Sequence, residues 1–502
     1  MGRQQPVELA GSGNTAGHPS RMQVPRVIPD DDTLERLQDI CEVVLTDDAS
    51  LEGASRDWWP ISIKWAIDGT VPALPAAVAV AASAEEVASI LAVCRESHVP
   101  VTTSAGRSGV CGGAVPLFGG VVLDMTTMAG ILDIDSKSLT ARVRAGTFGP
   151  PLEDELQHNG FTLGHWPQSF DISTVGGWLA CRSAGQYSTR YGKMEDMARS
   201  LQVVLADSSI IHTGYTAPRS STGPDLNHLF MGSEGTLGVI TEASLAIHPV
   251  PTASCRQAWS FTRFSDGLEA CRMILRSGAT PAVLRLYDSD ESALHFGTDG
   301  VSILIVYDEA DQGLLDWTGA AVNRECAAQG GEIADTGLVD RWFEKRNDVS
   351  ALAPLYKSGI VVDTIEVAAS WSKLHSLYTG CMESLHSLEG TLYASAHLSH
   401  SYIDGACIYM TFAGQMDGER TAATAEAYYN AAWQRVMAAV MQAGGTISHH
   451  HGIGIQRSRY LRDAMGSTWK VMEALKDAFD PTGILNPGKL GFSSYIAETP
   501  WA

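Results

Sequence analysis

The chain has 502 residues, of which 45% are hydrophobic and 18% charged, and this composition excludes a disordered or collagen-like protein. Thirty-five Lys and Arg residues against 57 Asp and Glu residues give a net charge of −22, which offers no attraction for a nucleic-acid backbone, so no nucleic-acid partner is expected. At roughly 150 residues per domain, the length predicts two or three domains.

Cysteine usage and the lack of long apolar segments favour a cytoplasmic location. Nine cysteines, spread from Cys41 to Cys407 without a C-x-x-C pair, are typical of reduced thiols in the cytoplasm. The longest apolar run, residues 76–82, is far shorter than the roughly 20 residues that cross a bilayer, and the polar start has no signal-peptide hydrophobic region. We expect a cytoplasmic protein, with peripheral membrane contact through a local apolar patch left open.

The N-terminal segment, residues 1–70, is predicted to be a tail followed by a packing segment. Its first 30 residues are rich in Gly, Ser, Gln and Pro without periodicity, which predicts a mobile tail. Trp58, Trp59 and Trp65 then lie close together, which is typical of a segment packed onto a larger body.

Residues 71–250 are predicted to form one α+β domain. Ser83 and Glu86 have capping-box spacing before a helical apolar pattern. Strand-like runs follow, separated by Gly or Asp turn signals, at 121–123, 139–143, 201–205, 210–211 and 237–247.

The remainder is predicted to form a second domain, residues 251–455, and a C-terminal segment, residues 456–502. An Ala-rich helix is expected over 421–442, closed by Gly444. Near the end, apolar residues at helical spacing up to Phe479 predict a helix that returns to the first domain.

Three stretches of small residues in the first domain could bind phosphate groups. The loop from Ala105 to Gly113 offers closely spaced backbone N–H groups, by which a chain can wrap a pyrophosphate. No helical pattern follows it, so it matches neither the Rossmann nor the P-loop fingerprint. Similar stretches at 167–177 and 232–240 favour a common phosphate-bearing ligand.

These loops belong to an ordered set of phrases that resembles the vanillyl-alcohol oxidase (PCMH-type) flavoproteins and, among them, most of all alkyldihydroxyacetonephosphate synthase. The resemblance covers about residues 55–490 and implies a two-domain PCMH-type FAD-binding fold with an α+β cap domain. The phrases that carry it are Gly164–Ser169, Ser173–Trp178, Tyr191–Asp196, Ser221–Asp225, Met231–Thr236, Arg285–Asp288, Tyr402–Tyr409, Ser448–Gly454 and Phe479–Lys489.

The resemblance implies that FAD is the cofactor. Synthases carry Gly-Gly-Gly-Thr-Ser where this chain has Ala105 to Gly109, and the longer phrase there looks more like D-lactate dehydrogenases. Cys111 suggests a covalent flavin link, but a free buried cysteine is commoner, and we expect non-covalent FAD. The residues expected to bind it are Thr103, Ser104, Ala105, Gly106, Arg107, Ser108, Gly109, Pro167, Gln168, Ser169, Ser173, Thr174, Gly176, Gly177, Ala180, Ser183, Glu234, Gly235, Thr236, Gly238, Val239 and Ile240.

The resemblance also implies catalytic and substrate-binding residues. Tyr402, in a predicted hairpin, would be the general acid/base, and Arg285, with Arg346 as a second candidate, would bind an anionic substrate. The residues His449, His450 and His451 can be read as a polar turn, as a metal site, or as an anion-binding or proton-transferring cluster. In an extended segment neighbouring side chains alternate in direction, so the three could not bind one ion; we expect a catalytic cluster and no metal.

The implied reaction is redox-neutral. Acyl-dihydroxyacetone phosphate, a lipid-like phosphorylated substrate, would lose a proton from C1, bind the flavin covalently, release its fatty carboxylate and accept a fatty alcohol, with the flavin as electron sink. The alternative is a flavin dehydrogenase of a 2-hydroxy acid such as D-lactate, whose His-rich metal phrase is only half present after His397. A flavin-binding protein without catalysis is a third class, disfavoured because the polar centre is retained. A homodimer is expected.

Overall fold

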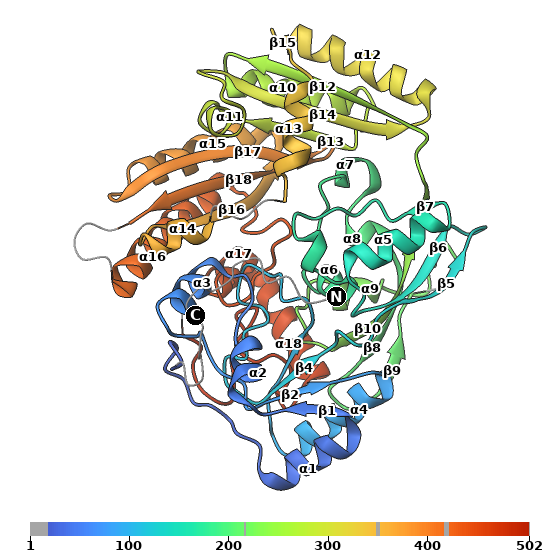
Figure 1. Ribbon diagram of the computed structural model, residues 1–502, viewed down its shortest axis with the longest axis vertical. Coiled ribbons are helices and arrows are strands. Elements are labelled where there is room, and N and C mark those ends of the chain that lie inside the picture. Colours follow the sequence, from blue (N-terminus) through green and yellow to red (C-terminus); the bar gives the residue numbers. More distant parts are fainter. Residues whose placement is uncertain (1–18, 215–216, 348–351, 416–420, 501–502) are drawn as a thin grey trace.

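The computed structural model describes residues 19–214, 217–347, 352–415 and 421–500. Two bodies make up the molecule: a base that carries three smaller sheets, and a cap built on one large sheet (Figure 1). Helices and sheets are mixed in both bodies, as the predicted two-domain α+β fold requires. Within the described residues, no helix is both long and apolar enough to cross a membrane.

The first sheet of the base has the strand order β1-β2-β4-β3. Strands β2, β4 and β3 are parallel, and β1 pairs antiparallel with β2. The elements are α1 (Asp31–Ile40), β1 (Val43–Leu45), α2 (Asp48–Gly53), α3 (Pro60–Ile67), β2 (Ala77–Val80), α4 (Ala84–Glu96), β3 (Val101–Ser104) and β4 (Val121–Asp124). Ser83 accepts a hydrogen bond from the backbone N–H of Glu86, as its predicted capping role requires.

The second sheet of the base is antiparallel, in the order β5-β6-β10-β8-β9. Its strands β6, β8, β9 and β10 match the predicted runs, whereas β5 was not predicted. The elements are β5 (Ile131–Asp135), β6 (Thr140–Arg144), α5 (Gly149–His158), β7 (Phe161–Thr162), η1 (Phe170–Ile172), α6 (Val175–Cys181), α7 (Ser188–Tyr191), α8 (Met194–Met197), β8 (Ala198–Val204), β9 (Ile210–His212), α9 (Asn227–Phe230), β10 (Val239–Ala246) and β11 (His248–Pro249), which pairs with β7.

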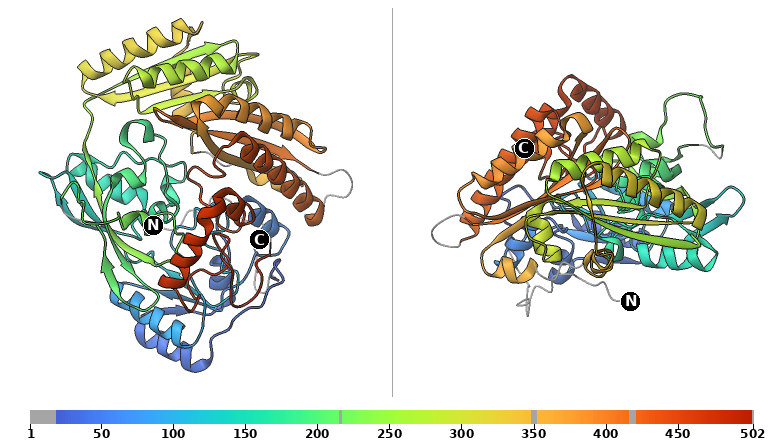
Figure 2. Two further views of the ribbon diagram at one scale, coloured as in Figure 1. Left: turned by 180° about the vertical axis from the view of Figure 1, so that it is seen from behind. Right: turned by 90° about the horizontal axis from the view of Figure 1, so that it is seen from above.

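The cap sheet is antiparallel, in the order β15-β12-β14-β13-β17-β18-β16. Helices α10, α12, α15 and α16 pack against it (Figure 2). The elements are β12 (Ala253–Phe261), α10 (Phe264–Arg276), β13 (Val283–Tyr287), α11 (Ser289–Phe296), β14 (Ser302–Ala310), α12 (Gln312–Ala328), β15 (Glu332–Ala334), α13 (Gly337–Lys345), α14 (Leu352–Lys357), β16 (Val361–Ser370), α15 (Trp371–His386), β17 (Thr391–Ser401), β18 (Gly405–Gly414) and α16 (Ala422–Ala443). The predicted Ala-rich helix is α16, closed by Gly444 at φ +68°.

The C-terminal segment returns to the base through α17 (Ser458–Met465), η2 (Gly466–Thr468) and α18 (Trp469–Phe479). The ring of Phe479 packs edge-on against Phe230, with 5.5 Å between ring centroids. After the helix, Leu485 forms a parallel bridge with Val101 at the edge of β3. The end of the chain therefore becomes part of the first sheet.

The N-terminal segment is partly corrected. Residues 1–18 of the predicted tail lie outside the described residues, but residues 19–30 pack on the body instead of being mobile. Arg21 makes a bidentate ion pair with Glu426 of α16 at 2.7 Å, and its backbone N–H donates to Val71. An irregular segment that pairs with distant backbone and side chains leaves no local periodicity in the sequence, which explains the error.

Candidate functional site

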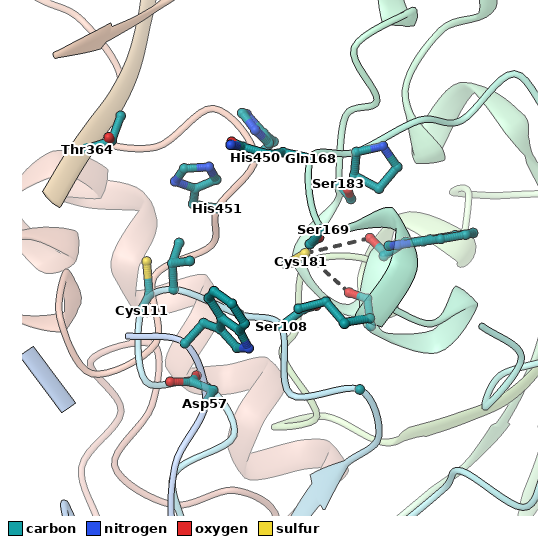
Figure 3. Close-up of a pocket in the computed structure, with 18 of the residues that line it drawn as sticks. Asp57, Ser108, Cys111, Gln168, Ser169, Cys181, Ser183, Thr364, His450 and His451 are labelled. Carbon is teal, nitrogen blue, oxygen red and sulfur yellow. Dashed lines mark hydrogen bonds between the residues drawn. The ribbon is translucent and has the colours of Figure 1, made fainter. Parts of the chain in front are cut away.

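A cavity of about 910 Å³ lies between the base and the cap. Figure 3 shows Gln168, Ser169 and Ser183 on one side of it, and Cys111 and His451 on the other. The cap closes it with side chains from α11, α13 and the strands β13, β16, β17 and β18. The three small-residue loops thus share one cavity.

Nearly all the predicted cofactor-binding residues line this cavity; the exceptions are Ser173 and Thr236. The Ser173 hydroxyl instead accepts a hydrogen bond from the Trp178 indole at 2.7 Å, and the Thr236 hydroxyl donates to the carbonyl of Ser233 at 2.7 Å. These two hydroxyls stabilise the conformation of their loops and do not line the cavity.

The cavity wall fits a large polar cofactor. The hydroxyls of Thr103, Ser104 and Thr174 are buried and have no hydrogen-bond partner among the described residues. Buried hydroxyls are costly unless bonded, so a bound ligand is the expected partner. A Cβ on Gly106 would come within 2.1 Å of the carbonyl oxygen of Ile172, so the loop requires glycine there.

Glu234 links the third loop to a distant segment of the chain. It lines the cavity, but its carboxylate accepts hydrogen bonds from the backbone N–H groups of Ile453 and Gly454 at 2.6 and 2.8 Å. Burial raises the pKa of this carboxyl, against the lowering effect of those donors. The third loop of the base is thereby tied to the segment that follows the histidine triplet.

Arg285 projects from β13 into the cavity. Its Nη2 lies 2.6 Å from Nε2 of His397, while its Nε is buried without a hydrogen-bond partner among the described residues. Nδ1 of His397 lies 2.8 Å from the carboxylate of Glu291. Burial, with Arg285, lowers the pKa of His397 to about 4, so the imidazole is neutral and accepts from the guanidinium. Arg285 is thus held in place with donor capacity left for an anion.

Arg346 also lines the cavity. Its Nη1 lies 3.2 Å from Oε1 of Gln186, and its guanidinium contacts the rings of Trp166, Tyr187 and Trp342 within 6.0 Å of each centroid. Aromatic faces around a guanidinium hold it in place by cation–π attraction. Both predicted substrate-binding arginines therefore face one cavity.

Tyr402 occupies the predicted hairpin between β17 and β18 but is not among the residues that line the cavity. Its hydroxyl donates to Oγ of Ser188 at 3.4 Å, and Nζ of Lys193 lies 4.6 Å from its ring centroid. Tyr409, seven positions further on, does line the cavity.

Tyr409, on β18, was missed by sequence reasoning. Its hydroxyl lies 2.8 Å from Nε2 of His400 and 2.9 Å from Nε2 of His450. Burial raises the pKa of Tyr409 well above its usual value and lowers those of both histidines. The hairpin register, which pairs Tyr409 with His397, was the available signal, because both then point to one face of the sheet.

Of the three consecutive histidines, His450 and His451 line the cavity and His449 does not. The segment is a bend rather than an extended strand. Its backbone is held by Glu366 of β16, which accepts from the N–H groups of His449 and His451 at 2.5 and 2.8 Å. Glu366 and Arg457 form a fully buried ion pair at 3.2 Å.

Two groups of potential metal ligands occur among the described residues. Cys407, His449 and His450 form one, and Glu366, His450 and His451 the other, each with donor atoms within 4.8 Å. Both nitrogens of His450 are in hydrogen-bond contact with protein groups, since Nε2 lies next to the Tyr409 hydroxyl and Nδ1 is 2.9 Å from Nδ1 of His449. The expectation of no metal stays a prediction.

Comparison with known proteins agrees with this site. Residues 75–214 match the family model described as an FAD binding domain, and residues 250–490 match the C-terminal domain of FAD linked oxidases. The chain is 31% identical over 437 residues to YgcU of Escherichia coli strain K12, an uncharacterised FAD-linked oxidoreductase, covering 84% of this chain and 90% of that one. The chain belongs to the FAD-linked oxidase family.

Other family members broaden the comparison. Alkyldihydroxyacetonephosphate synthase of Dictyostelium discoideum is 29% identical over 459 residues, covering 84% of this chain and 74% of the relative. A solved structure of an alkyldihydroxyacetonephosphate synthase superposes with a TM-score of 0.78 at 25% identity, covering 93% of this chain and 87% of that one. The predicted resemblance and the predicted cofactor, FAD, are confirmed.

Proposed function

We propose that this FAD-dependent enzyme exchanges the acyl group of acyl-dihydroxyacetone phosphate for a fatty alcohol. One observation carries the proposal: the Tyr409 hydroxyl, between two imidazoles, and the partly unpartnered Arg285 share a cavity with the three cofactor loops. A proton-transferring group, an anion ligand and a flavin site are the parts that this reaction needs.

Substrate binding falls to the arginines. Arg285 presents its free Nε to the phosphate, and a charge-assisted hydrogen bond from a guanidinium suits phosphate geometry. Arg346, held by its aromatic neighbours, offers a second cation to the same cavity. The two arginines would hold the phosphate end of the substrate in the cavity that the cofactor loops line.

Proton transfer falls to Tyr409. Because burial keeps its hydroxyl neutral and keeps His400 and His450 uncharged, one imidazole can take the hydroxyl proton while the tyrosine oxygen takes a proton from the substrate carbon. FAD, when bound, supplies the electron sink for that carbon. The fatty carboxylate is then replaced by the alcohol at the same carbon, so no electron acceptor is consumed.

A second candidate is oxidation of a 2-hydroxy acid such as D-lactate. It is favoured by the identity to YgcU, whose name states an oxidoreductase. Arg285 would then bind the substrate carboxylate.

Assay of the purified holoenzyme with both substrate classes separates the candidates. With acyl-dihydroxyacetone phosphate and a long-chain alcohol, we expect release of fatty acid without consumption of oxygen or dye. Bleaching of the flavin and reduction of dye by D-2-hydroxy acids, without ether formation, would establish the second candidate instead.

The predicted homodimer and the predicted membrane contact are consistent with this function. A fatty substrate favours transient contact of a cytoplasmic enzyme with a membrane surface, and we propose a homodimer as its working form. Co-sedimentation with phospholipid vesicles and light scattering after gel filtration test these two points separately.

A further inference from the structure

A continuous series of hydrogen-bond contacts passes through Tyr409 and extends beyond the cavity in both directions. On one side, Nδ1 of His400 lies 2.8 Å from the Ser188 hydroxyl, which accepts from Tyr402. On the other side, Nδ1 of His450 lies 2.9 Å from Nδ1 of His449. The series comes from both bodies, because Ser188 belongs to α7 of the base.

Each member of this series can accept one hydrogen bond and donate another, so every contact is satisfied when the donors run from Tyr402 towards His449. Ser188 accepts from Tyr402 and donates to Nδ1 of His400, whose Nε2–H then donates to Tyr409. Tyr409 in turn donates to Nε2 of His450, whose Nδ1–H donates to Nδ1 of His449. His449 is left with its proton on Nε2.

The last member lies outside the cavity and near the protein surface. His449 is partly buried and stacks on the ring of Tyr402, with 5.6 Å between centroids. Nζ of Lys193 lies 4.6 Å from the centroid of that ring and pairs with Asp196 at 2.6 Å, with side chains 25% and 48% exposed. His449 therefore lies between the buried Tyr409 and solvent.

We propose that protons move between Tyr409 and bulk water through His450 and His449, which makes His449 a positioning and relay residue that never touches substrate. This inference rests on the proposed proton transfer at Tyr409. The substrate proton goes to the Tyr409 oxygen, the Tyr409 proton to Nε2 of His450, the Nδ1 proton of His450 to Nδ1 of His449, and the Nε2 proton of His449 to water. Every group stays neutral at the end, and the reverse sequence returns a proton to the product.

The first test replaces His449 and measures hydrogen uptake. In D2O, His449→Ala holoenzyme should incorporate deuterium at C1 of acyl-dihydroxyacetone phosphate roughly 10²-fold more slowly than wild type. Added imidazole should restore much of the rate. His375→Gln, an exposed histidine on α15, is the matched control and should behave as wild type. Flavin content and melting temperature establish that each variant is folded. Uptake at the wild-type rate, or a slow rate that imidazole does not change, overturns the relay.

The second test needs no substrate, so it separates failure of the relay from failure of the proposed function. Holoenzyme labelled with 15N-histidine should show His450 protonated on Nδ1 and His449 on Nε2, with both signals shifted in Tyr409→Phe. His450 protonated on Nε2, or a His449 signal unaffected by Tyr409→Phe, would contradict the relay whatever the enzyme's substrate is. Wild-type enzyme that shows these tautomers but turns over neither substrate class refutes only the proposed function.

Discussion

Nη2 of Arg285 lies 2.6 Å from Nε2 of His397, although the two residues are 112 positions apart. The other ring nitrogen of His397, Nδ1, lies 2.8 Å from the buried carboxylate of Glu291. His397 also stacks on Tyr409 at 4.5 Å between centroids. One imidazole thus contacts both Arg285, the proposed anion ligand, and Tyr409, the proposed proton-transferring group.

Arg285→Ala should weaken substrate binding. Loss of a charge-assisted hydrogen bond to the substrate anion costs roughly 1.5 to 3 kcal/mol, so KM should rise roughly 10- to 150-fold at 1.4 kcal/mol per tenfold. Steady-state kinetics check this, with Arg36→Ala, in a surface ion pair with Glu96, as the control. An unchanged KM and kcat would remove Arg285 from the substrate site.

Tyr409→Phe should keep bound FAD and lose turnover by roughly 10²- to 10⁴-fold, the usual effect of a positioned general acid or base. Tyr402→Phe is the matched comparison, and we expect a smaller loss because Tyr402 does not line the cavity. Turnover numbers of the two variants decide between them. If Tyr402→Phe is the inactive variant and Tyr409→Phe is not, the acid/base group is the tyrosine that the sequence predicts.

FAD should be released completely by acid precipitation, because we expect no covalent link through Cys111. Gly106→Ala should lower the flavin content of the purified protein, since its Cβ would meet the Ile172 carbonyl and displace the loop. Gly53→Ala, where a Cβ meets nothing within 4 Å, is the control and should retain the wild-type ratio of flavin to protein absorbance. Yellow colour in the acid pellet would show a covalent attachment.

Glu366→Gln should destabilise the protein at neutral pH by roughly 3 to 5 kcal/mol, the cost of leaving a buried cation unpaired. Burial alone would raise the pKa of Glu366, but Arg457, His451 and His449 lower it to about 2 from the usual 4.5. A carboxyl group whose pKa is lowered on folding stabilises the fold at pH values above its pKa in the unfolded chain. This contribution is lost as pH falls from 4.5 towards 2.

Urea denaturation at pH 7 and at pH 3 measures this difference between wild type and Glu366→Gln. The gap in free energy of unfolding should narrow at the lower pH. Glu96→Gln breaks a surface ion pair and is the control, with a free energy of unfolding expected to stay close to that of wild type. A gap that is the same at both pH values would show that the ion pair with Arg457 does not control the titration of Glu366.

The sequence predicted those parts of the site that depend on short local patterns. Glycine loops and strand runs are recognisable because the backbone conformation they require restricts the residue types, and nearly all the expected loop residues line the cavity. Tyr409 and His400 were missed because their role depends on hairpin register and on contacts from other elements. Glu291 was missed for the same reason, since its partner His397 lies 106 positions away. The domain boundaries at 70, 250 and 455 stay predictions.

The return of the chain end to the first sheet has a consequence for how the enzyme is made. The backbone of Asn486 donates to Val101 at the edge of β3, and its side chain bonds the carbonyls of Gly113 and Glu234 at 3.0 and 2.7 Å. Asn486 and Gly113 are 373 residues apart, so the first glycine loop leaves the ribosome long before the residue that anchors it. Until then the loop lacks the contacts that hold it, and flavin binding is therefore expected only after Asn486 has left the ribosome.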